Sequence, residues 1–182
     1  MSSRLIIGAL TLLAVLHGST AAQAKVFYSR NEALELAFPN ADDVGSETFV
    51  LDQRQADRIQ SIAKCSLESK LVKIYKAMRD GNVIGYAMID IHNVRTLPEA
   101  FMVVLTPDGE VRSLRVLAFH EPLEYKPTRR WYRQFDNKSK DAPLRVGGDV
   151  HGVVGATLSA RATTRGVRRA LAFYEVLIQN GQ

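Results

Sequence analysis

Residues 151–159 read His-Gly-Val-Val-Gly-Ala-Thr-Leu-Ser and stand between a glycine-rich approach (residues 147–152) and a helical pattern that runs to about Ile178. A glycine-rich turn that opens into a helix leaves unpaired backbone N–H groups at the helix start. Together with the helix dipole, these groups favour a phosphate. A simpler interpretation is that Gly155 makes a tight turn and that Thr157 or Ser159 caps the helix. Local chemistry alone leaves both interpretations open.

The first 24 residues have the layout of a secretory signal peptide. Arg4 precedes an apolar run over residues 5–16, and a polar stretch then ends in Ala-Gln-Ala at residues 22–24. The apolar run is too short to cross a bilayer comfortably. We therefore expect cleavage after Ala24, a periplasmic or otherwise extracytoplasmic location, and a single mature domain over residues 25–182. An uncleaved N-terminal anchor is the alternative.

Charge and motif content argue against several function classes. Removing Arg4, the one charged residue among residues 1–24, lowers the net charge from +5 to +4, and no nucleic-acid-binding signature accompanies this excess. No hydrolase, P-loop or zinc motif occurs, and the histidines lack metal-ligand spacing. Cys65 is the one cysteine, so it is expected to be a free, packed thiol. We expect no catalytic residues, no metal and no nucleic-acid partner.

Alternating apolar residues predict two β-hairpins. Residues 71–77 and 83–90 flank an Asp-Gly turn, and residues 101–105 and 110–119 flank Pro-Asp-Gly at residues 107–109. The alternation in residues 110–119 slips once, which indicates a bulge or burial on both faces. The pattern predicts a four-stranded antiparallel sheet, and residues 47–51 form a further candidate strand.

Three helices are expected to pack on one face of this sheet. They cover residues 30–38 with Asn31 as the cap, residues 53–64, and the final run from Ser159. The prediction is an α+β fold: an antiparallel sheet of two hairpins with packed helices, including a C-terminal helix opened by the Gly-Ala-Thr-Leu-Ser turn. On that last helix, Arg161, Arg165 and Arg168 share one face, which is typical of a solvated stripe; only Arg161 is considered for phosphate contact.

Residues 120–135 are rich in side chains that bind planar or anionic ligands. Trp131 and Phe135 lie four residues apart on an expected helix, where either suits the core or a ligand wall. The arginines of this segment suit a solvated face as well as an anion site. His120 and Glu121 invite an acid/base interpretation, but no nucleophile lies nearby in the sequence.

The order of these parts resembles the FMN-binding domain family, the extracytoplasmic flavoproteins that include flavin-bearing subunits of ion-pumping electron-transport complexes. The resemblance spans about residues 70–178. It rests on five segments: residues 81–86 (Gly-Asn-Val-Ile-Gly-Tyr), 107–111 (Pro-Asp-Gly-Glu-Val), 120–122 (His-Glu-Pro), Arg130-Trp131 with Phe135, and 155–159 (Gly-Ala-Thr-Leu-Ser).

The resemblance implies FMN as cofactor, esterified through its phosphate to the last threonine of an Asp-x-x-(Ser/Thr)-Gly-Ala-Thr motif. A flavin transferase attaches it, with FAD as donor. The attachment residue here is Thr157, and the implied cofactor contacts are Gly155, Ala156, Leu158, Ser159, Glu121, Tyr125 and Trp131. The implied function is electron transfer between membrane-bound and extracytoplasmic redox partners, as a carrier rather than an enzyme with its own substrate.

Two positions depart from the family motif. His151 stands where the motif has Asp, and Val154 stands where it has Ser or Thr; Asp149 lies two residues before His151. The alternatives are therefore non-covalent FMN binding, or a cofactor-free exported scaffold on the same fold.

Overall fold

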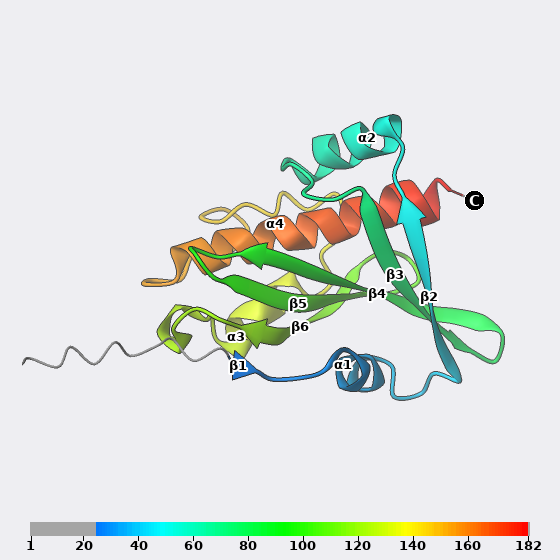
Figure 1. The fold of residues 1–182 in the computed structure, drawn as a ribbon, viewed down its shortest axis with the longest axis horizontal. Coiled ribbons are helices and arrows are strands. Elements are labelled where there is room, and N and C mark those ends of the chain that lie inside the picture. Colours follow the sequence, from blue (N-terminus) through cyan, green and yellow to red (C-terminus); the bar gives the residue numbers. More distant parts are fainter. Residues whose placement is uncertain (1–24, 182) are drawn as a thin grey trace, which may run out of the picture.

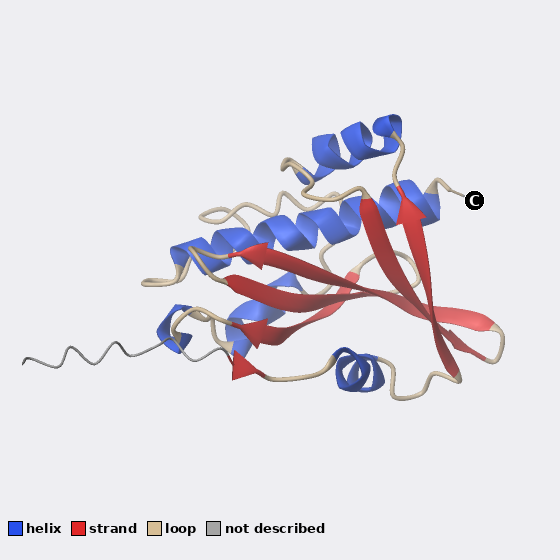
Figure 2. Cartoon of the chain, viewed as in Figure 1, coloured by secondary structure: helices blue, strands red, loops and turns tan. Residues whose placement is uncertain are grey.

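The computed structural model describes residues 25–181, which form one six-stranded antiparallel sheet with helices packed on it (Figures 1 and 2). The expected α+β class is confirmed. The strand order is β1-β6-β5-β4-β3-β2. The strands are β1 (Lys25–Val26), β2 (Asp43–Val50), β3 (Leu71–Arg79), β4 (Asn82–Asn93), β5 (Pro98–Leu105) and β6 (Val111–Phe119). The expectation of four strands was therefore wrong, because β1 and β2 extend the two hairpins at opposite edges.

The two hairpins form where the sequence predicts them. Between β3 and β4, Asp80 and Gly81 both have positive φ (50° and 75°), the backbone of a tight turn that suits an Asp-Gly pair. Arg79 pairs directly with Asn82 across it. Between β5 and β6, Gly109 has φ 85°, and its N–H donates to the carbonyl of Thr106.

The slip in the alternation of β6 marks two irregularities in its pairing with β5. The register shifts between Ala100 and Phe101 and again between Val104 and Leu105. As a result Val111 faces one apolar core and Leu117 the other. Of the two interpretations, the bulge is present, and residues of β6 are also buried on both faces of the sheet.

The helices are α1 (Arg30–Ala37), α2 (Gln53–Ala63), α3 (Arg129–Tyr132) and α4 (Thr157–Phe173), and α4 continues as a wider π turn over Tyr174–Gln179. Capping boxes start both α1 and α2, at Ser29 and Asp52. The predicted cap Asn31 was wrong, because the Ser29 hydroxyl and Glu32 satisfy the first turn instead.

Helices cover both faces of the sheet, so the expectation of a single helical face was wrong. Helices α2 and α4 bury one face over a core that includes Ile59, Phe101 and Leu171. Helix α1 covers the opposite face, where Leu34 and Phe38 pack with Met102 and Leu117. In Figure 1, α1 lies on the side of the sheet away from α2 and α4.

Helix α4 packs closely against the sheet at Gly166. A Cβ at this position would lie 2.5 Å from the ring of Phe101 and 2.6 Å from an oxygen of Asp90. A residue with a side chain at this position would force Phe101, Asp90 or the helix to move.

Within residues 25–181, no helix combines the length and the apolar character that crossing a bilayer requires. The predicted signal peptide, residues 1–24, lies outside the described residues.

Candidate functional site

The turn before α4 places Thr157 at an exposed helix start. Gly155 has φ 80°, and no atom lies within 4 Å of the place a Cβ would occupy, so glycine is needed for the backbone conformation rather than for space. The N–H of Ala156 donates to the carbonyl of Val153 at 3.1 Å, which closes the turn. Thr157 is the first residue of α4 and is exposed.

No side chain caps α4. Ala156 occupies the cap position, and the first intrahelical bond runs from Ala160 N–H to the Ala156 carbonyl at 3.0 Å. The Thr157 hydroxyl instead points back to the Val153 carbonyl at 3.4 Å. The simpler interpretation of the motif, a capping hydroxyl, is therefore wrong. The N–H groups of the first turn remain available to an anion.

A cavity of about 210 Å³ opens at this helix start. Three segments meet there: the turn between β4 and β5, the segment after β6, and residues 155–159. The lining residues are Val94, Arg95, Glu121, Tyr125, Gly155, Ala156, Thr157, Leu158 and Ser159. Seven of the eight residues that the family resemblance implied, all but Trp131, are thus brought together.

Two lining residues that no sequence pattern marks, Arg95 and Val94, come from the turn between β4 and β5. Arg95 is exposed and is the cation of this cavity. A guanidinium beside uncapped helix N–H groups suits a phosphate. In the sequence, Arg95 lies some 60 residues from the motif and in no recognisable pattern, so only the fold reveals it.

Glu121 positions the turn that carries Arg95. Its Oε1 accepts hydrogen bonds from the backbone N–H groups of Arg95 (3.2 Å), Thr96 (2.7 Å) and Leu97 (2.8 Å). Burial raises the pKa of this carboxyl, but these hydrogen bonds outweigh it and hold the pKa below its usual value. Glu121 lines the cavity, and its side-chain hydrogen bonds all go to residues 95–97 of this turn.

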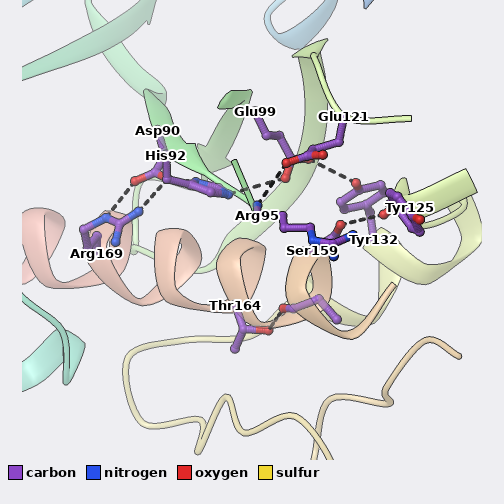
Figure 3. A network of polar contacts seen from close by, with 11 residues as sticks. Asp90, His92, Arg95, Glu99, Glu121, Tyr125, Tyr132, Ser159, Thr164 and Arg169 are labelled. Atoms are coloured by element: carbon purple, nitrogen blue, oxygen red, sulfur yellow. Dashed lines mark hydrogen bonds and ion pairs between the residues drawn. The ribbon is translucent and has the colours of Figure 1, made fainter. Parts of the chain in front are cut away.

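Ser159 and Tyr125 join the helix to the segment after β6. Ser159 is fully buried, and its hydroxyl donates to the backbone carbonyl of Tyr125 at 2.5 Å (Figure 3). This bond engages the Ser159 hydroxyl, whereas that of Thr157 is exposed. Of the two hydroxyls in the motif, Thr157 is the accessible one.

Trp131 does not line the cavity. Its indole N–H donates to the carbonyl of His151 at 2.7 Å, and Gln134 accepts the His151 N–H at 2.6 Å. Trp131 also packs edge-on against Phe135 and Tyr132. These residues hold the loop that leads into the motif.

The two departures from the family motif have exposed side chains, since His151 and Val154 both face solvent. Asp149 is held elsewhere: its oxygens accept from the N–H of Arg145 (2.8 Å), the N–H of Leu144 (3.2 Å) and Lys138 Nζ (2.9 Å). Despite burial, which raises it, the pKa of Asp149 is lowered by these bonds. In this conformation Asp149 does not replace the missing motif carboxylate.

A buried ionic cluster joins the sheet to α4 (Figure 3). Arg169 on α4 donates two hydrogen bonds to Asp90 on β4, at 2.8 and 2.7 Å. His92 Nδ1 lies 2.6 Å from the same carboxylate, and its Nε2 lies 3.4 Å from Glu99. Burial favours neutral His92, but the hydrogen bond to Asp90 and the nearby Glu99 carboxylate outweigh it and raise its pKa. No motif in the sequence marks this cluster.

Two contacts surround the cluster. Glu99 is 0% exposed and accepts from the Tyr132 hydroxyl at 3.3 Å. Cys65, free as expected, lies with its sulfur 3.7 Å from Arg169.

The comparisons with known proteins agree with this geometry. Residues 98–172 match the model of the FMN-binding domain family, which confirms the resemblance and the expected cofactor, FMN. Among solved structures, the crystal structure of Shewanella oneidensis NqrC is similar, with a TM-score of 0.55 and 15% identity over 84% of this chain and 89% of that chain. At this identity the likeness establishes the fold. No curated protein matches the chain in sequence.

Proposed function

We propose, because residues 98–172 match the FMN-binding domain family, that this chain is an exported electron-transfer protein with FMN esterified to Thr157. The observation that carries the proposal is the position of Thr157, exposed at an uncapped helix start inside the cavity that Arg95 also lines. The protein is then a redox carrier rather than an enzyme with its own substrate.

The residues present fit the phosphate end of FMN. Backbone N–H groups and Arg95 supply positive charge, while Val94, Tyr125 and Leu158 supply apolar surface. The volume, about 210 Å³, lies below that of pockets that enclose a whole ligand. The cavity therefore matches the phosphate and its neighbouring atoms rather than the entire cofactor.

In attachment by a flavin transferase, the Thr157 hydroxyl of this chain supplies the attacking oxygen. The hydroxyl oxygen attacks the FMN phosphorus of FAD, a new P–O bond forms, and the pyrophosphate bond breaks. AMP leaves, and the hydroxyl proton is lost to solvent or to the transferase. The exposure of Thr157 and the length of its bond to Val153, 3.4 Å, leave the oxygen free to react.

Bound FMN supplies the redox chemistry, and the residues of this chain position it. Arg95 and the first turn of α4 compensate the phosphate charge. Glu121 fixes the turn of Arg95, and Ser159 fixes the segment of Tyr125 against the helix. An ester bond keeps the cofactor from diffusing away outside the cytoplasm.

The proposal also includes export of the chain and redox partners outside the cytoplasm. Cleavage after Ala24 would release a mature protein that begins at Lys25, and its partners would be membrane-bound or extracytoplasmic redox proteins. Expression with the native N-terminus, fractionation and mass measurement of the exported form test this. A cytoplasmic protein of uncleaved mass would contradict it.

Covalent attachment is tested by co-expressing the chain with a flavin transferase, denaturing it, and measuring gel fluorescence and mass. We expect an FMN-sized mass increase that Thr157→Ala abolishes and Ser159→Ala retains. A colourless chain of unmodified mass, made beside a transferase that labels a control substrate, would overturn covalent attachment.

The second candidate is a cofactor-free scaffold on the same fold, favoured by His151 and Val154 at the motif positions. Unlabelled protein that also fails to bind free FMN would support it. Unlabelled protein that binds free FMN at the Thr157 cavity would instead show the non-covalent alternative.

A further inference from the structure

A second cavity, of about 390 Å³, lies on another part of the molecule, between the segment after β1, strand β6 and the region of α3. None of residues 155–159 lines it. We call it the basic cavity, because four cationic side chains line it: Arg115, Lys126, Arg129 and Arg133. Its volume falls in the range of sites that enclose small ligands.

The four cations form no ion pairs within the part of the chain that the structure describes. Among residues 25–181, none of them has a carboxylate oxygen within 4.0 Å, whereas half-buried Arg169 and half-buried Lys138 each pair with an aspartate. The one acid in the lining is Asp136. Burial raises the pKa of Asp136 against the opposing effect of Arg133. Like charges gathered around one cavity repel each other unless an anion compensates them.

Aromatic rings form much of the remaining wall: Phe27, Tyr28 and Tyr132. Arg115 lies over the ring of Tyr28, with its guanidinium carbon 5.1 Å from the ring centroid. Lys126 Nζ lies over the ring of Phe27, 5.5 Å from the ring centroid. Leu114 and Val116 of β6 add aliphatic surface. A wall that mixes rings with guanidinium groups suits a planar ligand with negative charge.

We propose that the basic cavity binds a small aromatic anion, a ring system that carries a phosphate. The cations compensate the phosphate, and the ring lies against the aromatic and aliphatic wall. This site is separate from the Thr157 cavity and does not depend on flavin attachment.

The test uses three probes that separate ring from charge: AMP, adenosine and inorganic phosphate. We expect saturable one-to-one binding of AMP to the full mature chain by isothermal titration calorimetry. Adenosine and phosphate should each bind at least tenfold more weakly. Because the ring of Trp131 packs 5.3 Å from that of Tyr132, fluorescence of the single tryptophan gives a second readout.

Substitutions of the lining residues test whether AMP binds in the basic cavity. Arg129→Gln with Arg133→Gln should weaken AMP binding at least tenfold, and Asp136→Asn should strengthen it. Arg130→Gln is the matched control, since Arg130 is exposed on the same helix but does not line the cavity. Its affinity should stay within twofold of that of the unmodified chain, and thermal melting should show all variants folded.

Three outcomes would overturn the proposal. The first is the absence of saturable AMP binding. The second is an affinity that the double variant leaves unchanged, which would put the anion elsewhere, the Thr157 cavity included. The third is equal affinity for AMP and for phosphate, which would show that the ring of the ligand does not contribute to binding. None of these outcomes bears on FMN attachment, which is measured separately by mass.

Discussion

The hydroxyl of Ser159 donates a hydrogen bond to the backbone carbonyl of Tyr125 at 2.5 Å. This bond ties the first turn of α4 to the segment that follows β6, so both walls of the Thr157 cavity share one anchor. The motif serine is therefore a structural residue, and the threonine two positions earlier is the exposed one.

Ser159→Ala should lower the free energy of unfolding by about 1–3 kcal/mol, because a partly buried carbonyl loses its donor. Urea denaturation measures the loss. Thr164→Val is the control: its buried hydroxyl bonds only within the helix, to Ala160, so its loss should cost less. An equal cost for both variants would argue against an anchoring role.

His151→Asp with Val154→Thr should raise the fraction of chains that a flavin transferase labels, because it restores the residues of the family motif. Both side chains are exposed, so stability should change by less than about 0.5 kcal/mol. In-gel fluorescence against total protein measures the labelled fraction. Each single substitution separates the two contributions, and an unchanged fraction in the double variant would show that the two departures do not limit attachment.

Arg169→Met should lower the free energy of unfolding by about 3–5 kcal/mol, because it leaves the largely buried carboxylate of Asp90 without its two-bond partner. Adding Asp90→Asn should recover part of this loss, since the unpaired charge is then removed. Denaturant unfolding of both singles and the double gives the coupling energy. Additive losses would contradict the pairing.

Stability should fall as the pH rises, through His92. Its pKa in the folded chain is raised above the unfolded value of about 6.5. Its stabilising contribution is therefore fully present below about pH 6.5 and is lost as the pH rises through the folded pKa. Unfolding free energies of the unmodified chain and His92→Gln should differ most near pH 6 and converge at higher pH. A difference that does not vary with pH would exclude protonated His92 from the cluster.

The hairpins and the principal helices could be predicted from the sequence because their signals are local. Asp80-Gly81 and Pro107-Asp108-Gly109 fix turns by backbone preference. The long helical pattern at the C-terminus corresponds to α4. Strand β1 has only two residues, too few for a periodic signal. Whether α1 lies above or below the sheet depends on pairings that no local pattern records.

In the candidate site, too, some residues could be predicted from local sequence and others could not. The motif residues were found through their order in the chain, and the fold brings them together with Glu121 and Tyr125. Arg95 lines the cavity from a turn whose backbone N–H groups donate to Glu121. The cluster of Asp90, His92 and Arg169 joins a strand to a helix nearly 80 residues away, a relationship that depends on the three-dimensional packing alone.

The absent side chain at Gly166 lets α4 pack directly against Phe101 and Asp90 at this point, so this contact helps to set the tilt of the helix. Thr157 lies nine residues before it, a lever arm of roughly 14 Å at the rise of an α-helix. A tilt of about 4° around this contact would move the threonine by about 1 Å, a displacement comparable to the tolerance of a preorganised site. The precision with which Thr157 is presented thus depends on an alignment set in the middle of the core, far from the hydroxyl itself.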